Sequence, residues 1–187
     1  MLPSDYAAQD CLLARALETV GERWTLLIVR DAFFGVRRFS DFLSHLDIPK
    51  AVLSERLKGL VRDGVMQRRP DPKRPGREIY ELTQAGRDLW PAIYALRTWG
   101  ARYRAPDGPR RAFTHFACQT ELEDDGSCPA CGITPEAHDV VMSLRPNAPQ
   151  LRYDPISVAL LEPHRLLEPL GRQPQVLTPA EQPPGAE

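Results

Sequence analysis

Apolar residues recur at helical spacing over the first part of the chain. Within residues 11–20, CLLARALETV, they repeat every three to four positions, and this repeat predicts a helix that Gly21 ends. Residues 24–34 are apolar on most sides, which is typical of a helix buried at the centre of a domain. We expect Thr25 to cap the start of this second helix and Gly35 to end it.

The next stretch, residues 38–82, predicts two short helices and a hairpin. Ser40 is placed to cap a helix over residues 41–46, and a turn then leads into a helix over residues 49–63 that Gly64 ends. At about 100° per residue, the apolar face of this later helix consists of Leu53, Leu57, Leu60 and Val61. The opposite face consists of Ala51, Glu55, Lys58 and Arg62, with Ser54 and Arg56 at its edges.

Residues 65–69 and 78–82 are strand-like runs that flank the sequence PDPKRPG. Three prolines and a glycine in this connection predict an irregular, projecting loop between two strands. The order helix, helix, hairpin predicts a mainly α fold with a small β-hairpin wing, the winged helix-turn-helix. The alternative is a small α+β domain whose charged helix face is only solvated.

A further helix follows Thr83, which can cap it, and Pro91 within it implies either a later start or a kink. Its apolar stripe contains Leu89, Ile93, Leu96 and Trp99, with Trp90 and Tyr94 beside it. This stripe and that of residues 11–20 lie outside the helix-turn-helix, so other apolar surface must shield them from water. A two-fold partner would supply it, so we predict a homodimer. The alternative is packing against the C-terminal part of the same chain.

Composition divides the chain into three predicted parts: residues 1–106, residues 107–143 and residues 144–187. A polar linker, RAPDGPRR, joins the first two parts, and the second holds three of the four cysteines. The third part is proline-rich, with nine prolines in 44 residues. Within it, SVALLEPHRLLEPL is expected to form a short docking helix, and the end, PAEQPPGAE, is expected to be disordered.

Charge is distributed unevenly along the chain. Residues 1–106 carry 18 basic and 13 acidic residues, whereas residues 107–187 carry 6 and 12. Residues 37–77 hold 11 basic against 5 acidic side chains, the local excess that a phosphate-binding surface needs. The sequence has no apolar run of about 18 residues, as a membrane span requires, and its start, MLPSDYAAQD, does not resemble a secretory signal. The uneven placement of the cysteines favours a reducing cytoplasm.

The pattern His115-x2-Cys118-x9-Cys128-x2-Cys131 supplies four metal ligands in two close pairs. Three thiolates and one imidazole make a closed tetrahedral site, which suits a structural Zn²⁺ rather than a catalytic one. We therefore predict structural zinc as the cofactor. His138 is an alternative fourth ligand in place of His115, and a redox pair is the competing interpretation of the CxxC sequence.

Many spaced positions over about residues 11–103 match one family. They are Cys11, Ala16-Leu17, Val20-Gly21, Trp24 to Ile28, Arg30, Gly35, Arg38-Phe39, Leu53, Arg56-Leu57, Leu60, Gly64, Tyr80, Leu82-Thr83, Gly86, Leu89, Pro91 and Trp99. In these positions the chain resembles the HxlR-type transcriptional regulators, bacterial relatives of the MarR-type winged-helix repressors. The resemblance implies a homodimer built on the first and last helices that binds a pseudo-palindromic operator in double-stranded DNA. Residues 107–143 resemble the small zinc-ribbon extension of some members.

We expect residues 38–82 to bind this DNA. The arginines and lysines are suited to phosphates or guanine edges, and Ser54 and Glu55 to backbone or cytosine contacts. The wing residues would lie along the adjacent minor groove. The candidate DNA-binding residues are Arg38, Lys50, Ser54, Glu55, Arg56, Lys58, Arg62, Lys73, Arg74 and Arg77.

The sequence therefore predicts a sequence-specific DNA-binding transcriptional regulator, a homodimeric repressor that responds to a small-molecule or redox signal. Some members of the family sense electrophiles or oxidants through the cysteine that Cys11 matches, which makes Cys11 a candidate redox sensor. The alternative for Cys11 is a small residue packed at the dimer seam. A second candidate function is a zinc-dependent adaptor that binds proteins rather than DNA. His45, His138 and His164 are isolated in the sequence, so we expect no enzyme.

Overall fold

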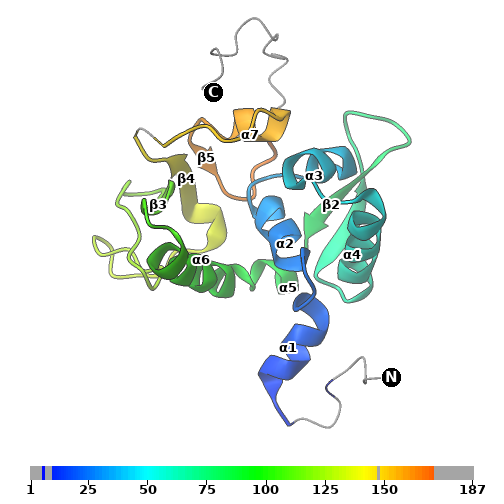
Figure 1. Ribbon diagram of the computed structural model, residues 1–187, viewed down its shortest axis with the longest axis horizontal. Coiled ribbons are helices and arrows are strands. Elements are labelled where there is room, and N and C mark those ends of the chain that lie inside the picture. The colour runs from blue at the N-terminus through cyan, green and yellow to red at the C-terminus, as the bar shows by residue number, and fades with distance from the viewer. Residues whose placement is uncertain (1–5, 7–9, 147, 171–187) are drawn as a thin grey trace, which may run out of the picture.

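Helix α2, Thr25–Phe33, lies at the centre of the molecule, between the helix-turn-helix and the C-terminal sheet (Figure 1). The structure is a computed structural model that describes residue 6, residues 10–146 and residues 148–170. Its other elements are α1 (Leu12–Val20), α3 (Phe39–Leu46), α4 (Lys50–Arg62), β1 (Met66–Pro70), β2 (Glu78–Leu82), α5 (Gln84–Arg87), α6 (Trp90–Arg104), β3 (Arg111–His115), η1 (Ala137–Asp139), β4 (Val140–Leu144), α7 (Pro155–Ala159) and β5 (His164–Arg165). The predicted mainly α fold with a β-hairpin wing is confirmed. Among the described residues, no helix has both the length and the apolar character that crossing a bilayer requires.

Helices α3 and α4 form the predicted helix-turn-helix. Between them Asp47 adopts a left-handed backbone conformation with φ of 53°, so the chain turns sharply before Pro49, the N-cap residue of α4. The α4 side chains Leu53, Leu57 and Leu60 are 0%, 0% and 2% exposed. Burial of each leucine stabilises the fold by about 2 kcal/mol, and it leaves the opposite, polar face of α4 in solvent.

Two predicted helix caps are wrong. Thr25 and Ser40 lie within α2 and α3, and the N-cap positions are occupied by Trp24 and Arg38, whose side chains make no capping hydrogen bond. Thr25 is 2% exposed, and its N–H donates to the carbonyl oxygen of Glu22 at 3.1 Å. The start of α2 is therefore set by burial and by the preceding main chain rather than by a side-chain cap.

The helix predicted after Thr83 is divided into two. Thr83 caps α5 as predicted, since its hydroxyl oxygen accepts a hydrogen bond from the N–H of Gly86 at 3.3 Å. Pro91 lies in the first turn of α6, where a residue without an N–H removes no helical hydrogen bond. Of the two predicted effects of this proline, the structure therefore has the later helix start.

The C-terminal sheet has three antiparallel strands in the order β3-β4-β5 (Figure 1). Its third strand comes from the proline-rich region, where SVALLEPHRLLEPL was expected to be one helix. That expectation is wrong for most of the segment, because α7 ends at Ala159 and the chain then forms β5. The N–H of Leu167 donates to the carbonyl oxygen of Phe33 at 2.7 Å, which fastens this segment to the end of α2. The predicted boundaries at 106 and 143 stay predictions, and PAEQPPGAE lies outside the described residues.

Four aromatic rings join α2 and α6 to the C-terminal sheet. Phe33 of α2, Trp90 and Tyr94 of α6 and Phe113 of β3 pack with ring centroids 5.1–5.8 Å apart. Such tilted pairs contribute about 1 kcal/mol each beyond the area that they bury. Trp90 and Tyr94 are therefore covered within the chain, as the alternative of intramolecular packing predicts for this part of α6.

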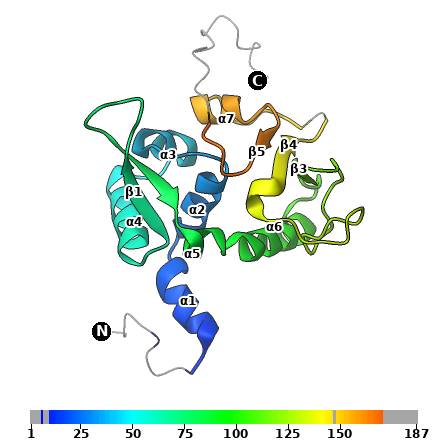
Figure 2. The same ribbon diagram turned by 180° about the vertical axis from the view of Figure 1, so that it is seen from behind.

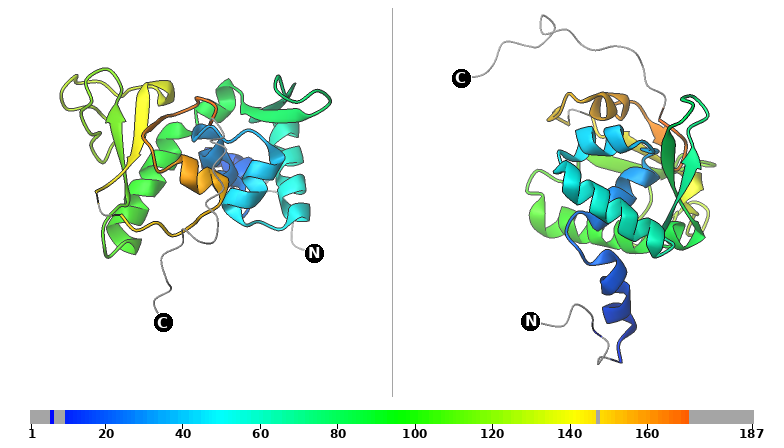
Figure 3. Two further views of the ribbon diagram at one scale, coloured as in Figure 1. Left: turned by 90° about the horizontal axis from the view of Figure 1, so that it is seen from above. Right: turned by 90° about the vertical axis from the view of Figure 1, so that its right-hand side faces the viewer.

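Other apolar side chains on α1 and α6 stay exposed. They are Leu12 at 89%, Leu13 at 67%, Leu17 at 40%, Leu96 at 54%, Trp99 at 53% and Tyr103 at 59% exposure. Helix α1 projects away from the body of the molecule (Figures 2 and 3), and only Ala14 of this helix is buried. The described chain thus leaves the apolar face of its first helix and one face of α6 in solvent.

Gly35, in the loop between α2 and α3, holds the C-terminal segment close to the helices. Its φ of 82° is left-handed, and its carbonyl oxygen accepts a hydrogen bond from the N–H of Leu170 at 3.2 Å. A β-carbon at this position would overlap the carbonyl oxygen of Glu168. We predict that Gly35→Ala lowers the free energy of unfolding, measured by urea denaturation, by about 2–4 kcal/mol.

Gly59→Ala is the matched control for this substitution. Gly59 lies inside α4, where an added β-carbon meets no atom within 4 Å. Because alanine favours a helix interior over glycine by about 1 kcal/mol, this variant should be at least as stable as the wild type. Equal destabilisation by the two variants would contradict the close contact at Gly35.

Candidate nucleic-acid interface and metal centre

The outer face of α4 and the β1–β2 hairpin lie on the same side of the molecule, away from the C-terminal sheet (Figure 1). All the residues predicted for the outer face of α4 are exposed: Ala51, Glu55, Lys58 and Arg62. Lys50 is exposed at the first position of the helix, and Ser54 and Arg56 are half-buried at its edges. Helix α4 therefore presents a polar and mainly basic surface.

The hairpin carries the second group of predicted contacts. Its strands pair antiparallel over their whole length, from Met66 opposite Leu82 to Pro70 opposite Glu78. The side chains of the connecting loop, which projects beyond the strands, are exposed at Lys73, Arg74 and Arg77. The loop thus brings three cations to the same side of the molecule as α4.

Asp71 anchors this loop. It is 5% exposed, and its carboxylate accepts hydrogen bonds from Nε of Arg38 at 2.8 Å and from the N–H of Lys73 at 2.9 Å. The Arg38 guanidinium, followed by the Lys73 N–H, holds the pKa of Asp71 below its usual range. Arg38, predicted to contact DNA, is thus placed where it positions the loop. We did not single out Asp71 from the sequence, although an acid within the basic run PDPKRPG was the available signal.

Two of the predicted α4 cations have protein partners. The Arg56 guanidinium donates to Glu22 at 2.8 Å, and its side chain is 22% exposed. Arg62 is 77% exposed and pairs with the adjacent Asp63 at 2.7 Å. The exposed pair costs little to exchange for a phosphate, whereas Arg56 is held back toward the loop that precedes α2.

The four predicted metal ligands, His115, Cys118, Cys128 and Cys131, come together at one end of the C-terminal sheet. Their candidate ligand atoms all lie within 4.8 Å of one another. The Sγ atom of Cys118 is 3.4 Å from Nδ1 of His115 and 3.4 Å from Sγ of Cys128. Tetrahedral coordination with Zn–S bonds of about 2.3 Å separates sulfurs by about 3.8 Å. The cluster therefore has the size and donor set of a tetrahedral metal site.

Two tight turns present these ligands. In the first, the N–H of Gln119, which has a left-handed φ of 57°, donates to the carbonyl oxygen of His115 at 2.8 Å. In the second, the N–H of Gly132, with φ of 67°, donates to the carbonyl oxygen of Cys128 at 2.9 Å. Hydrogen bonds from Thr120 lower the pKa of the Cys118 thiol to about 6. The CxxC sequence thus lies in a turn and not at the start of a helix, as a thioredoxin-like pair would.

Two histidines named in the sequence have other partners. His138, the alternative ligand, lies outside the cluster and contacts the carboxylates of Glu136 at 3.2 Å and Asp139 at 3.3 Å. His45 packs between α3 and α2, with its Nδ1 2.7 Å from the fully buried carboxylate of Asp31. This contact joins α3 to α2, and the intervening sequence gives no sign of it.

Cys11 occupies the N-cap position of α1 and is exposed. It lies far along the chain from the three clustered cysteines, and α1 projects from the body of the molecule (Figure 3). Exposure satisfies one requirement of a reactive thiol. The assignment of Cys11 as a redox sensor stays a prediction.

The chain has clear relatives. A family model described as HxlR-like helix-turn-helix matches residues 19–107. The HTH-type transcriptional regulator Rv3095 of Mycobacterium tuberculosis is 46% identical over 132 residues, which cover 66% of this chain and 84% of the relative. The HTH-type transcriptional regulator YdeP of Bacillus subtilis is 31% identical over 104 residues, 54% of this chain and 81% of the relative.

Solved structures agree with these relatives. PA1607, described as a transcription factor, is similar with a TM-score of 0.58 and 35% sequence identity, over 70% of this chain and 92% of that chain. The relatives are named as transcriptional regulators and not as enzymes. The helix-turn-helix, the hairpin and the sequence matches lead to one conclusion: the chain belongs to the HxlR-like helix-turn-helix family.

Proposed function

We propose that this transcriptional regulator binds an operator through α4 and the β1–β2 hairpin, as a homodimer. The observation that carries the proposal is the placement of the exposed cations of α4 and of the anchored hairpin loop on one side of the molecule (Figure 1). A helix of this width fits the major groove, and a hairpin beside it reaches the adjacent minor groove. The relatives are named as HTH-type transcriptional regulators, which supports the same function.

Each predicted residue has a place in this arrangement. Lys50, Lys58 and Arg62 would bind phosphates along the major groove, and Ser54 and Glu55 would meet base edges. The loop cations Lys73, Arg74 and Arg77 would follow the minor-groove backbone. Arg38 would act mainly by holding Asp71, and Arg56 would reach a phosphate by exchanging it for the Glu22 carboxylate.

The exposed apolar faces of α1 and α6 support the proposed homodimer. Their leucines and aromatic side chains, of which Leu13 and Trp99 are 67% and 53% exposed, would be buried by the same surfaces of a second chain. Transfer of such surface out of water stabilises an interface by about 25 cal/mol per Å². Two copies would also place two α4 helices for the two halves of a pseudo-palindromic operator.

We further propose that the cluster of His115, Cys118, Cys128 and Cys131 holds a structural zinc ion. Cysteine and histidine are the ligands that zinc prefers, and four protein ligands leave no open position for catalysis. Cys128 is fully buried, so bound metal would lie on the inner side of residues 107–143. The proposed role of zinc is to hold the two turns together.

The test of DNA binding compares a variant that loses a phosphate contact with a variant that loses a base contact. Arg74→Ala should weaken binding to an operator and to a random duplex alike, with the slope of log affinity against log salt reduced by about one unit. Ser54→Ala should weaken operator binding by about 1 kcal/mol or more and leave random-duplex binding nearly unchanged. Fluorescence anisotropy with DNA from upstream of the gene, at several salt concentrations, measures both.

The matched control is Arg102→Ala, which removes a 60% exposed arginine from α6. It should leave both affinities unchanged. Equal losses on the two duplexes for Arg74→Ala and Ser54→Ala would contradict the division between phosphate and base contacts. Failure of the wild-type protein to bind either duplex would favour the adaptor function instead.

A further inference from the structure

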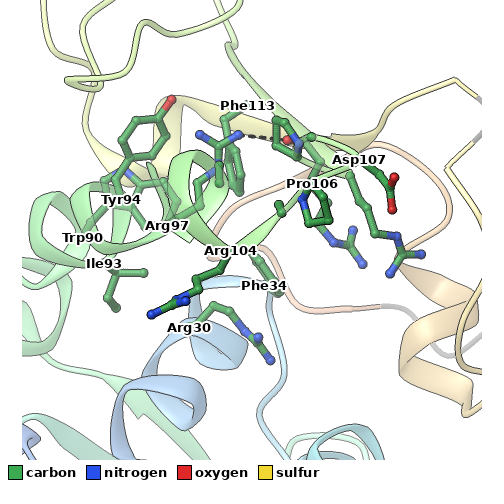
Figure 4. A pocket seen from close by; sticks show the side chains of 16 residues that line it. Arg30, Phe34, Trp90, Ile93, Tyr94, Arg97, Arg104, Pro106, Asp107 and Phe113 are labelled. Atoms are coloured by element: carbon green, nitrogen blue, oxygen red, sulfur yellow. Dashed lines mark hydrogen bonds between the residues drawn. The ribbon is translucent and has the colours of Figure 1, made fainter. Parts of the chain in front are cut away.

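A cleft of about 520 Å³ opens between α6, the end of α2 and the start of β3 (Figure 4). Its position differs from that of the metal cluster and from that of the α4 and hairpin surface. The volume lies within the range of about 300–1,000 Å³ that is typical of small-molecule sites. The side chains that line the cleft determine which class of ligand it can bind.

Two kinds of side chain dominate the walls of the cleft. The aromatic residues that line it are Phe34, Trp90, Tyr94 and Phe113. The cationic residues that line it are Arg30, Arg97, Arg104, Arg110 and Arg111. Against these five arginines, the lining contains one acidic residue, Asp107. The walls thus combine flat apolar surface with an excess of positive charge.

The innermost arginine has neutral partners. Arg111 donates from Nη1 to the carbonyl oxygen of Leu160 at 3.2 Å, and its guanidinium lies 5.6 Å from the ring centroid of Phe34. Burial, followed by the nearby charges of Arg30 and Arg110, lowers the pKa of Arg111 to about 10. The Asp31 carboxylate offsets part of this effect. A partly buried cation close to two others is costly, and a further anion beside it would relieve that cost.

Arg97 has a similar environment on the opposite wall. Its guanidinium lies 4.9 Å from the ring centroid of Phe113 and 5.2 Å from that of Tyr94. It donates to the carbonyl oxygen of Arg111 at 3.0 Å, so one wall is tied to the other. In the described part of the chain, neither Arg97 nor Arg111 forms an ion pair with a carboxylate, whereas Arg30 pairs with Asp31 at 2.6 Å.

We infer that this cleft binds a small organic anion with a flat apolar body, of the aryl carboxylate class. The aromatic walls would stack against the body of the ligand, and the arginines would bind its carboxylate, a geometry that guanidinium groups match well. Figure 4 shows Trp90 and Phe113 together with Arg30, Arg97 and Arg104 around the same space. Duplex DNA fits this cleft less well, because phosphate groups gain nothing from packing against a concave aromatic wall.

The site would also connect two regions of the molecule. Helix α6 contributes Ile93, Arg97 and Arg104 to the cleft, while Trp99 and Tyr103 lie roughly on the other side of the helix and are exposed. A ligand would therefore press on the helix that is proposed to form the dimer. A role of this ligand as an effector rests on the proposed DNA-binding function, but its binding does not.

The test uses the full-length, metal-loaded protein and 2-naphthoate, with 2-naphthamide as a neutral probe of the same shape. Calorimetric titration in the absence of DNA should give saturable binding of one naphthoate per chain. Loss of the charge-assisted hydrogen bonds should make 2-naphthamide about tenfold weaker or more. Equal affinity for the two compounds, or no saturation by naphthoate at millimolar concentration, would overturn the proposal.

Variants locate the binding. Arg111→Gln should weaken naphthoate about tenfold, and Arg104→Gln serves as a second test because its side chain is exposed and contacts mainly the exposed Trp99 ring, 5.8 Å away. Arg102→Gln, an α6 arginine outside the cleft, should bind as the wild type does, and an equal loss in this variant would contradict the site.

If naphthoate does not bind while Arg111→Gln weakens operator binding, the arginines serve DNA instead. If naphthoate binds but operator affinity is unchanged, the ligand site stands and its effector role fails.

Discussion

Replacement of Cys128 by serine is expected to abolish binding of the proposed zinc ion and to unfold residues 107–143. Cys128 is the fully buried cysteine of the cluster, with its Sγ 3.4 Å from that of Cys118, and a serine hydroxyl is a poor zinc ligand. Structural zinc contributes about 10–16 kcal/mol to small zinc domains. That is as large as the whole stability of a typical domain, about 5–15 kcal/mol.

The loss of folded structure should extend beyond residues 107–143. The hydroxyl of Tyr94 donates to the carbonyl oxygen of Glu123 at 3.1 Å, and Thr98 donates to that of Asp124 at 3.1 Å. Both acceptors lie in the segment between the two pairs of candidate ligands, so part of α6 is covered by the segment that the proposed zinc ion would hold in place. We therefore expect the fluorescence of Trp90, which is 6% exposed, to shift to longer wavelength when the metal is removed.

Elemental analysis and thermal melting check this expectation. The wild type should carry zinc in a one-to-one ratio to the chain, and Cys128→Ser should carry none and be destabilised by about 4 kcal/mol or more. Cys11→Ser is the matched control, since Cys11 lies at the exposed N-cap of α1. It should keep both the zinc and the stability. A wild-type protein that folds without metal and is indifferent to a chelator would refute the proposed zinc site.

Local chemistry explains what the sequence predicts well. The face of α4 that contains Leu53, Leu57 and Leu60 follows from helical periodicity, which depends only on neighbouring residues. Prolines and a glycine similarly predict the projecting hairpin loop from their own backbone restrictions. The metal cluster is predicted because its ligands are supplied as two short-range pairs, and His115 rather than His138 completes it.

Long-range packing explains what the sequence does not predict. Trp90 and Trp99 lie nine residues apart on α6 and so on opposite sides of the helix; the first is covered by Phe113, whereas the second is exposed. Helical periodicity separates the two faces, but which face is covered depends on where β3 packs, and periodicity does not predict that. The arginine-lined cleft has the same origin, because it brings Arg30 and Arg111 together from segments that are far apart in the sequence.

The exposed apolar faces of α1 and α6 lead to the second large expected effect. Substitution of Leu13 or Trp99 by aspartate should convert the proposed homodimer to monomers, because a carboxylate buried at an apolar interface costs several kcal/mol. Both side chains are exposed in the single chain, at 67% and 53%, so the fold of each chain should survive. Light scattering should give twice the chain mass of 21.1 kDa for the wild type and that mass itself for the variants.

Operator affinity should fall when the dimer is converted to monomers. A monomer can hold only one half-site at a time, and loss of the linked second half-site costs about 10²–10⁴ in affinity. Leu151→Asp is the matched control, since Leu151 is also exposed, at 65%, but lies outside α1 and α6. It should leave mass and affinity unchanged. Aspartate variants that remain dimeric and bind operator normally would mean that another surface pairs the chains, and the exposed apolar faces would then need a different partner.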